Sequence, residues 1–249
     1  MKNIYKKTLI VSPHSDDEIF TLPFLYSSNN SFEEIDLLLI EQDKLRYKEC
    51  LASCQRHGFN LITLPADVNA RGLYFYEILD DLIDYFSALK DKYDLILSPI
   101  IEGGHQDHDT ICLAILYSKK FISYKTKIIL FSTYRNIDSL PFLYTNGFSK
   151  KVPSDLIFSV KPSKNLIYLF LVTIYFCYKS QYKTWIMLAP SLLISYFGNS
   201  INKFVLANNL EVREALNLIP KNPLYQTYRK LSKRSWLLAH NKIIKDFIK

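Results

Sequence analysis

The 249-residue sequence is poor in glycine and proline, with 6 and 10 residues respectively. This composition argues against collagen-like repeats and low-complexity disorder, which need these residues in excess. No segment recurs at a fixed period, and no linker rich in glycine, serine or proline divides the chain. Hydrophobic residues make up 49% and charged residues 22%, which is typical of one globular domain or a core with a helical appendage.

Cysteine is also scarce, and the four cysteines are too few to form a disulfide framework at this length. Cys50 and Cys54 share one face of a predicted helix, but a single CxxxC pair is poor evidence for a metal site. We expect all four cysteines to be buried thiols in a reducing compartment, which predicts a cytoplasmic protein.

Long hydrophobic runs are absent as well. The most apolar stretch, residues 166–178, is shorter than the roughly 20 residues that a spanning helix needs, and a second follows at residues 185–197. The first residues do not resemble a signal peptide, because their short apolar run leads into charged residues. We expect a buried or interface-forming helix pair, with membrane-surface contact as the alternative.

The net charge of +7 is concentrated in part at residues 228–249, where apolar residues are interleaved at near-helical spacing. This pattern predicts a terminal helix with a solvated basic face. The alternative is attraction to anionic lipid or a phosphorylated substrate, hence association with a membrane. No recognition helix or basic motif is legible, so we expect no nucleic-acid partner.

Strand-like and helix-like segments alternate through the first part of the chain. The predicted strands are residues 8–12, 35–40, 61–64, 94–98, 127–132 and 156–160. The predicted helices between them are residues 44–57, 73–92 and 107–119. This alternation indicates an α/β fold with a Rossmann-like, mostly parallel sheet flanked by helices.

From Ser163 onward the pattern predicts helices. We therefore expect a catalytic α/β core at residues 1–160 and a helical C-terminal extension at residues 161–249. Because no linker separates the two parts, the extension is expected to pack on the core within a single domain.

Two polar clusters follow predicted strands. The first is PHSDDE at residues 13–18, after the first strand, and the second is GGHQDH at residues 103–108, after the fourth. Three of the five histidines fall in these clusters. Because sites in open parallel sheets form beyond the carboxyl ends of the strands, the two clusters are expected to meet.

These residue types suit a catalytic zinc, which takes three protein ligands and keeps a position for water. His14, either Asp16 or Asp17, and one of His105 and His108 supply three ligands. The remaining carboxylate then serves as general base, and the remaining histidine stabilises the developing oxyanion. This division of labour is typical of amide hydrolysis. No glycine-rich nucleotide-binding motif follows any strand, which argues against an unrelated nucleotide-binding protein.

The paired motifs resemble those of the LmbE-like, PIG-L family of zinc-dependent de-N-acetylases, PHPDDE and HPDH or HxDH. The resemblance extends over residues 7–181. It includes Arg46 and Glu49 on the helix after the second strand, an expected structural or entrance-lining pair. It also includes the Y-x-SQ sequence at residues 178–181.

By position, the resemblance implies the zinc ligands His14, Asp17 and His108. It implies Asp16 as general base, and His105 as the protonated imidazole that stabilises the oxyanion or protonates the leaving amine. Asp107 would orient His105 and hold its charge. Arg135, just after the fifth predicted strand, stands where many members place an arginine near the site.

The sequence departs from the family pattern in the loops around these motifs. Ser15 replaces the usual proline, residues 19–23 replace a frequent Gly-Gly, and residues 41–43 replace a longer glycine-containing loop. Every ligand position is retained, so the departures affect the expected substrate and not the chemistry.

The leading hypothesis is a zinc-dependent deacetylase that hydrolyses the N-acetyl group of an amino sugar in a glycoside, sugar nucleotide or glycan precursor. One alternative is a non-catalytic carbohydrate- or metal-binding relative. Another is a deacylase that removes a formyl or other acyl group from a modified or lipid-linked sugar. The expected cofactor is Zn²⁺, and the expected partner is an N-acetylated sugar.

Overall fold

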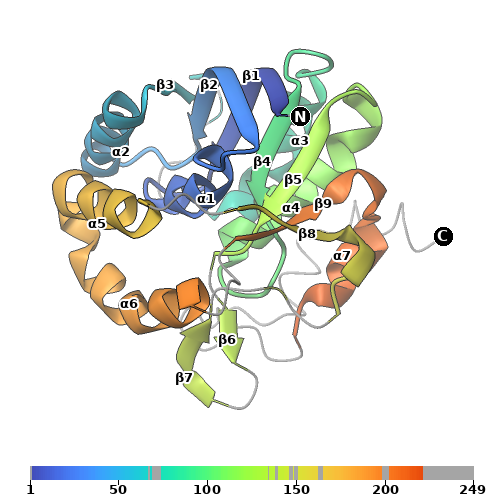
Figure 1. Cartoon of the computed structure of the whole chain (residues 1–249). Coiled ribbons are helices and arrows are strands. Elements are labelled where there is room, and N and C mark those ends of the chain that lie inside the picture. Colours follow the sequence, from blue (N-terminus) through green and yellow to red (C-terminus); the bar gives the residue numbers. More distant parts are fainter. Residues whose placement is uncertain are drawn as a thin grey trace.

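The computed structural model describes residues 2–66, 68, 74–133, 135–137, 140–145, 148, 151–161, 165–197 and 202–220. Its main sheet has seven strands in the order β3-β2-β1-β4-β5-β9-β8 (Figure 1). They are β1 (Asn3–Ser12), β2 (Asn30–Leu39), β3 (Asn60–Thr63), β4 (Leu95–Pro99), β5 (Lys127–Phe131), β8 (Ile157–Ser159) and β9 (Lys203–Leu206). Neighbours from β3 to β5 pair in parallel, and β9 pairs antiparallel with both β5 and β8. The predicted α/β fold with a mostly parallel sheet is confirmed.

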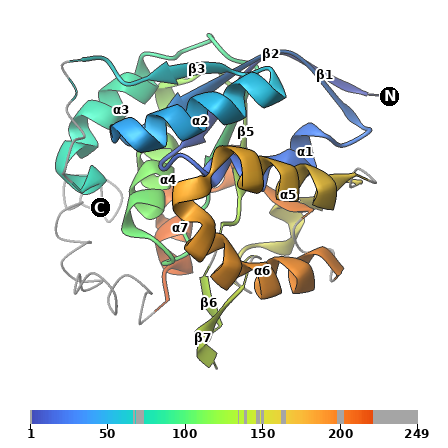
Figure 2. The same ribbon diagram turned by 90° about the vertical axis from the view of Figure 1, so that its left-hand side faces the viewer.

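Helices cover both faces of this sheet, as Figures 1 and 2 show. One face carries α1 (Leu22–Leu25), α2 (Lys44–His57) and α5 (Leu166–Cys177). The other face carries α3 (Leu79–Ser87), α4 (Gln106–Ser118) and α7 (Val212–Leu218). Successive side chains of a strand point to opposite faces, so a strand covered on both sides reads as a continuous apolar run. Leu9 and Val11 of β1 accordingly enter one core, and Ile10 enters the other.

Local chemistry sets the ends of α2. The Asp43 carboxylate accepts hydrogen bonds from the backbone N–H groups of Leu45 and Arg46, both at 2.9 Å. Gly58 ends the helix at φ 74°, a left-handed conformation that costs glycine no steric penalty. The predicted helix at residues 44–57 is therefore confirmed at both ends.

The C-terminal part contributes more than helices. After α5 and α6 (Tyr182–Phe197), the chain forms β9, which the sequence analysis did not predict. Strand β9 lies between β5 and β8, so the sheet crosses the proposed division at residue 160. A separate hairpin pairs β6 (Arg135–Ile137) with β7 (Leu140–Thr145). The remaining short helices are 3-10 helices at Asp17–Thr21, Phe75–Ile78, Lys119–Phe121, Ser154–Leu156, Lys179–Gln181 and Ala207–Asn209.

Two further expectations bear on burial and on membranes. All four cysteines are free and buried, as predicted. Among the described residues, no helix combines the length and the apolar character that crossing a bilayer requires. The predicted terminal helix at residues 228–249 lies outside the described residues.

His57, at the end of α2, joins three helical elements. Its Nε2 lies 2.9 Å from Thr173 Oγ1 of α5, and its Nδ1 lies 2.8 Å from the hydroxyl of Tyr26, which follows α1. Burial, with a smaller contribution from the Arg56 charge, lowers the pKa of His57 to about 4 from its ordinary 6.5. The folded protein therefore holds this ring neutral where the unfolded chain protonates it.

This contact predicts a pH-dependent stability. Between pH 6.5 and about 4 the unfolded state binds a proton at His57 that the folded state does not bind. The free energy of unfolding therefore falls as the pH falls through that window. We expect the free energy of unfolding of His57→Gln to fall less steeply over the window than that of the unaltered protein. Urea unfolding at several pH values measures both slopes, and identical slopes would contradict the interpretation.

Candidate metal and catalytic site

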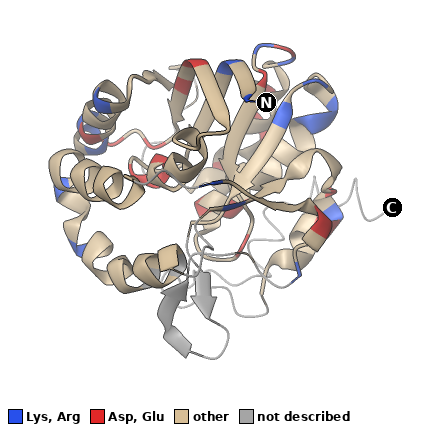
Figure 3. Cartoon of the chain, in the orientation of Figure 1, with Lys and Arg blue, Asp and Glu red and all other residues tan. Residues whose placement is uncertain are grey.

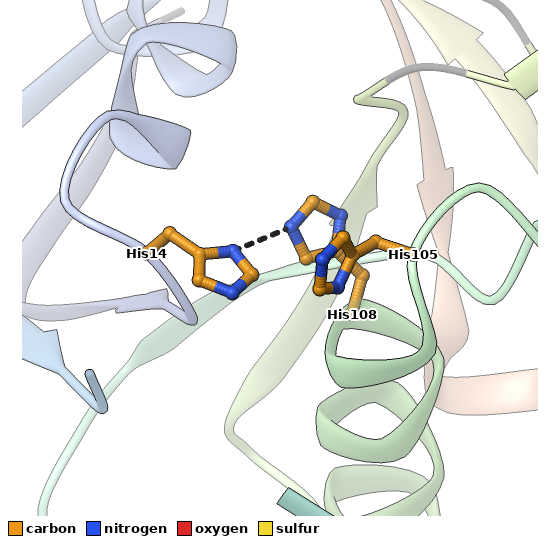
Figure 4. Close-up of side chains that lie close together, drawn as sticks. All are labelled: His14, His105 and His108. Atoms are coloured by element: carbon orange, nitrogen blue, oxygen red, sulfur yellow. Dashed lines mark hydrogen bonds between the residues drawn. The ribbon is translucent and has the colours of Figure 1, made fainter. Parts of the chain in front are cut away.

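The two polar clusters meet at the carboxyl ends of β1 and β4, which are adjacent parallel strands. This is the point where the strand order reverses, because β1 leads to β2 on one side and β4 leads to β5 on the other. His14 stands in the loop after β1, whereas His105 is the N-cap of α4 and His108 lies in its first turn. Figure 4 shows the three imidazole rings converging from these two segments.

Three donor atoms in this cluster lie very close together. His14 Nδ1 is 3.2 Å from His108 Nε2 and 3.3 Å from Asp17 Oδ2, and His108 Nε2 is 3.1 Å from Asp17 Oδ2. Zinc bonds of about 2.0–2.1 Å in a tetrahedral arrangement place neighbouring ligand atoms roughly 3.3 Å apart. The spacing and the N/N/O chemistry of this trio fit one zinc ion.

A second trio replaces Asp17 by His105. Ligand atoms of His14, His105 and His108 all lie within 4.8 Å of one another, so these three side chains could also hold a metal ion. The Nδ1 atom of His105 accepts from the backbone N–H of Asp107 at 3.3 Å and lies 3.6 Å from Asp107 Oδ2. The Asp17 trio has donor spacings of 3.1–3.3 Å that match tetrahedral zinc, and His105 lies beside it, with its ring centre 4.6 Å from that of His14.

A hydrogen-bond chain fixes the orientation of His108. The Thr133 hydroxyl donates to Glu102 Oε1 at 2.9 Å, which uses its only proton. It must therefore accept from His108 Nδ1, which lies 3.0 Å away. The neutral ring then carries its proton on Nδ1 and presents the Nε2 lone pair to the site. Glu102 also accepts from the backbone N–H of Thr133 and the Ser132 hydroxyl, both at 2.9 Å.

Asp107 holds His14 in the corresponding way. His14 Nε2 lies 3.2 Å from Asp107 Oδ2, so a proton on Nε2 leaves the Nδ1 lone pair facing the other donors. The backbone N–H of Phe75 donates to the second carboxylate oxygen at 3.3 Å. Asp107 thus lies nearer to His14 than to His105, the residue that the sequence analysis paired with it.

The electrostatics of the site favour a cation at its centre. Burial lowers the pKa of His14, but Asp107 and Asp17 outweigh that effect and raise it to about 10. Burial raises the pKa of Asp17, but the neighbouring His108 and His14 rings hold it below its usual range. A proton and a metal ion compete for the same imidazole lone pairs, because the negative charge of the nearby carboxylates stabilises either cation.

Asp16 lies outside the trio and has different partners. Its Oδ1 is 3.3 Å from Arg46 Nη1, which also donates to Ser15 Oγ at 3.4 Å. Burial and the Asp17 charge raise the pKa of Asp16 to about 6, whereas Arg46 opposes the rise. The site therefore contains two adjacent carboxylates in different environments, one among the histidines and one against a guanidinium.

The Y-x-SQ segment docks three polar groups beside the site. The buried Tyr178 hydroxyl donates to Glu18, which also accepts from Ser53 Oγ at 2.6 Å. Glu49 accepts from the Ser180 backbone N–H at 2.7 Å and from its hydroxyl at 2.6 Å. Gln181 Oε1 accepts from Arg46 Nη2 at 2.9 Å. Arg46 and Glu49, the expected structural or entrance-lining pair, thus bind residues 180 and 181 of the C-terminal extension.

Two supporting residues were missed from the sequence. Glu102 and Thr133 follow β4 and β5, so the strand-end rule that found the histidines could have included them. Arg135, predicted to lie near the site, is the first residue of β6, and its side chain lies outside the described part of the structure.

No family model and no curated protein matches the sequence. The N,N'-diacetylchitobiose deacetylase from Pyrococcus horikoshii shares its fold, with a TM-score of 0.51 and 15% identity over 83% of this chain and 87% of that chain. Two further structures are each 12% identical to this chain. One is Dbv21, the deacetylase of the pseudoaglycone of the antimicrobial A40926 (TM-score 0.49, 80% of this chain and 95% of that chain), and the other is GalB, a 4-carboxy-2-hydroxymuconate hydratase from Pseudomonas putida (TM-score 0.47, 81% and 95%). At these identities the first likeness establishes the fold alone.

The contact between Tyr178 and Glu18 gives a stability prediction. Burial raises the pKa of Glu18 to about 8, and Tyr178→Phe removes one of its two side-chain donors without opening a large cavity. We expect the free energy of unfolding to fall by about 1–3 kcal/mol, as when a buried polar group loses its partner. Denaturant unfolding measures the change. The matched control is Tyr182→Phe, at an exposed tyrosine, and equal effects of the two substitutions would refute the role.

Proposed function

We propose that this protein is a zinc-dependent deacetylase that hydrolyses the N-acetyl group of an amino sugar. The observation that carries the proposal is the trio of donor atoms within 3.3 Å, with a separate carboxylate, Asp16, and a third histidine, His105, beside it. The paired sequence motifs support the reaction class. The sugar substrate is taken from the same family resemblance and accords with the deacetylase whose fold this chain shares.

The proposed zinc ligands are His14 Nδ1, Asp17 Oδ2 and His108 Nε2. When bound, zinc supplies Lewis-acid polarisation of the amide carbonyl and makes water acidic enough to lose a proton near neutral pH. The protein residues keep both imidazole lone pairs directed at that point, through Asp107 on one side and Thr133 on the other.

Asp16 is assigned as the general base that removes a proton from the attacking water. Its carboxylate takes that proton as the water oxygen bonds to the carbonyl carbon. Arg46 Nη1, 3.3 Å from Asp16 Oδ1, holds the carboxylate in place. A purely structural metal site would need no such second carboxylate, which favours catalysis over the non-catalytic alternative.

His105 is assigned to the departing amine. With Nδ1 near Asp107, Nε2 is the atom that faces substrate, stabilises the negative oxygen and then gives its proton to the amine nitrogen as the C–N bond breaks. Protonation of Nδ1 would replace the hydrogen bond that it accepts from the Asp107 N–H by donation to the Asp107 carboxylate, whose Oδ2 lies 3.6 Å away. The products are acetate and a free amino sugar, so the step consumes one water and no further reactant.

The direct test measures acetate release from a panel of N-acetylated amino sugars, including N,N'-diacetylchitobiose. We expect turnover that is lost after chelation and restored by zinc, because the carbonyl and the water both depend on the metal. Zinc content is measured on the same samples. Full activity in metal-free protein would reject the zinc mechanism. Release of a carboxylic acid other than acetate would show that the enzyme removes a different acyl group.

Adjacent isosteric substitutions separate the two carboxylate roles. Asp16→Asn should keep its zinc and lower kcat by roughly 10²–10⁴-fold, the usual contribution of a general base. Asp17→Asn should lose zinc, because an amide oxygen is a weaker ligand than a carboxylate. Metal analysis and steady-state kinetics check both variants. The assignment fails if Asp16→Asn loses the metal while Asp17→Asn retains it.

A further inference from the structure

Helices α5 and α6 carry large apolar side chains on a face that no other described element covers. We call this surface the α5–α6 face; its most exposed members include Leu171, Tyr175, Phe176, Ile186, Ile194 and Phe197. Tyr175 is 73% exposed and Phe197 76%. Monomeric soluble proteins rarely expose large contiguous apolar patches, and such patches mark interaction surfaces.

The same face contains a groove between the two helices with a volume of about 930 Å³. Leu171, Ile174 and Tyr175 line it from α5, and Tyr182, Ile186 and Leu193 line it from α6. Its lining is almost wholly apolar apart from tyrosine hydroxyls and Lys179. Figure 1 shows α5 and α6 at the left of the molecule, with α3 and α7 toward the right.

Charge distinguishes this region from the rest of the chain. Residues 156–210 contain no aspartate or glutamate, although the whole chain has 24. The charged residues in this stretch are Lys161, Lys164, Lys179, Lys183 and Lys203. Figure 3 shows both helices free of acidic residues. Arg56 of α2 adds a further cation at the edge, 5.0 Å from the centre of the Phe176 ring.

We propose that the α5–α6 face docks on the surface of a bilayer with anionic headgroups. Helices that lie in a membrane interface combine an apolar face with lysine and arginine at its margin, and tyrosine suits the depth of the headgroups. Anionic lipid attracts each lysine near the surface, and no acidic residue in this stretch opposes that attraction. Neither helix can span the membrane, so the attachment is peripheral.

A second copy of the chain fits this face less well. A two-fold contact would place the face against itself and bring two sets of lysines into one interface. Neither helix offers a carboxylate to neutralise them. Lipid phosphate supplies the missing negative charge, whereas a second copy does not.

The face also lies beside the candidate site. Gln181, between α5 and α6, accepts from Arg46 Nη2 at 2.9 Å, and Arg46 Nη1 lies 3.3 Å from Asp16. Two side-chain contacts thus link the docking face to the proposed general base. The proposal does not depend on the deacetylase assignment, since binding to a membrane is measured without turnover.

The test is cosedimentation of the full-length protein with phosphatidylcholine vesicles, with and without phosphatidylglycerol. We expect binding to the anionic vesicles that weakens with added salt. Tyr175→Ser combined with Phe197→Ser should reduce the partition coefficient by roughly tenfold or more, because each loses a large apolar group from the interface. Lys179→Gln combined with Lys183→Gln should reduce it by a similar factor on anionic vesicles only.

The matched control replaces exposed aromatic residues elsewhere, Phe121→Ser with Tyr124→Ser, which also neighbour lysines. This variant should bind vesicles as the unaltered protein does. Thermal unfolding establishes that each variant is folded. The proposal is overturned if the unaltered protein ignores anionic vesicles. It is also overturned if the α5–α6 variants bind them fully, which would place the attraction in another segment such as residues 228–249.

Light scattering without lipid measures the oligomeric state and so tests whether a second copy of the chain covers the α5–α6 face. A dimer that becomes a monomer in the Tyr175→Ser, Phe197→Ser variant would make this face an interface between copies and would reject the proposal. A monomer in both proteins, with vesicle binding lost only in the variant, is the expected result.

Discussion

Three donor atoms, on His14, Asp17 and His108, lie 3.1–3.3 Å apart. Many of the surrounding contacts hold these atoms at that short distance. Lone pairs at this distance repel unless a positive charge lies between or upon them. The site therefore holds each ring from behind, through Asp107 for His14 and Thr133 for His108. These outer hydrogen bonds determine which nitrogen carries a proton, and so which lone pair a cation meets.

The sheet topology makes this approach possible. Parallel pairing of β1 with β4 brings two loops, distant in sequence, to the same edge, and α4 begins there with His105 as its cap. Placing His108 three residues later turns it toward the same point. Asp16 and Asp17 illustrate the precision of this arrangement. They are neighbours in sequence, yet one side chain joins the histidines and the other meets Arg46.

The elements with local signals were predictable from sequence. Asp43 and Gly58 define α2 by capping chemistry, and the apolar runs gave the parallel strands. Strand β9 could not be found this way, because four residues acquire their strand character only by pairing between β5 and β8. The chain from Glu102 through Thr133 to His108 likewise depends on strands meeting in space. Motif spacing identified the converging histidines. The ligand roles of His14, Asp17 and His108 stay predictions, as do the roles of Asp16, His105, Asp107 and Arg135.

The C-terminal extension differs from the core in sequence pattern, yet it supplies hydrogen bonds on which buried groups of the core depend. Tyr178 donates to Glu18, Ser180 donates to Glu49, and Arg46 donates to Gln181, so two carboxylates and a guanidinium of the core depend on four consecutive residues. Glu18 and Glu49 are both buried, and a buried carboxylate that loses its donors is costly. Separation of the core from residues 178–181 would therefore remove hydrogen-bond donors from both Glu18 and Glu49. The hydrogen bond from Arg46 to Gln181 also connects the segment between α5 and α6 to the carboxylate of Asp16, which Arg46 contacts as well.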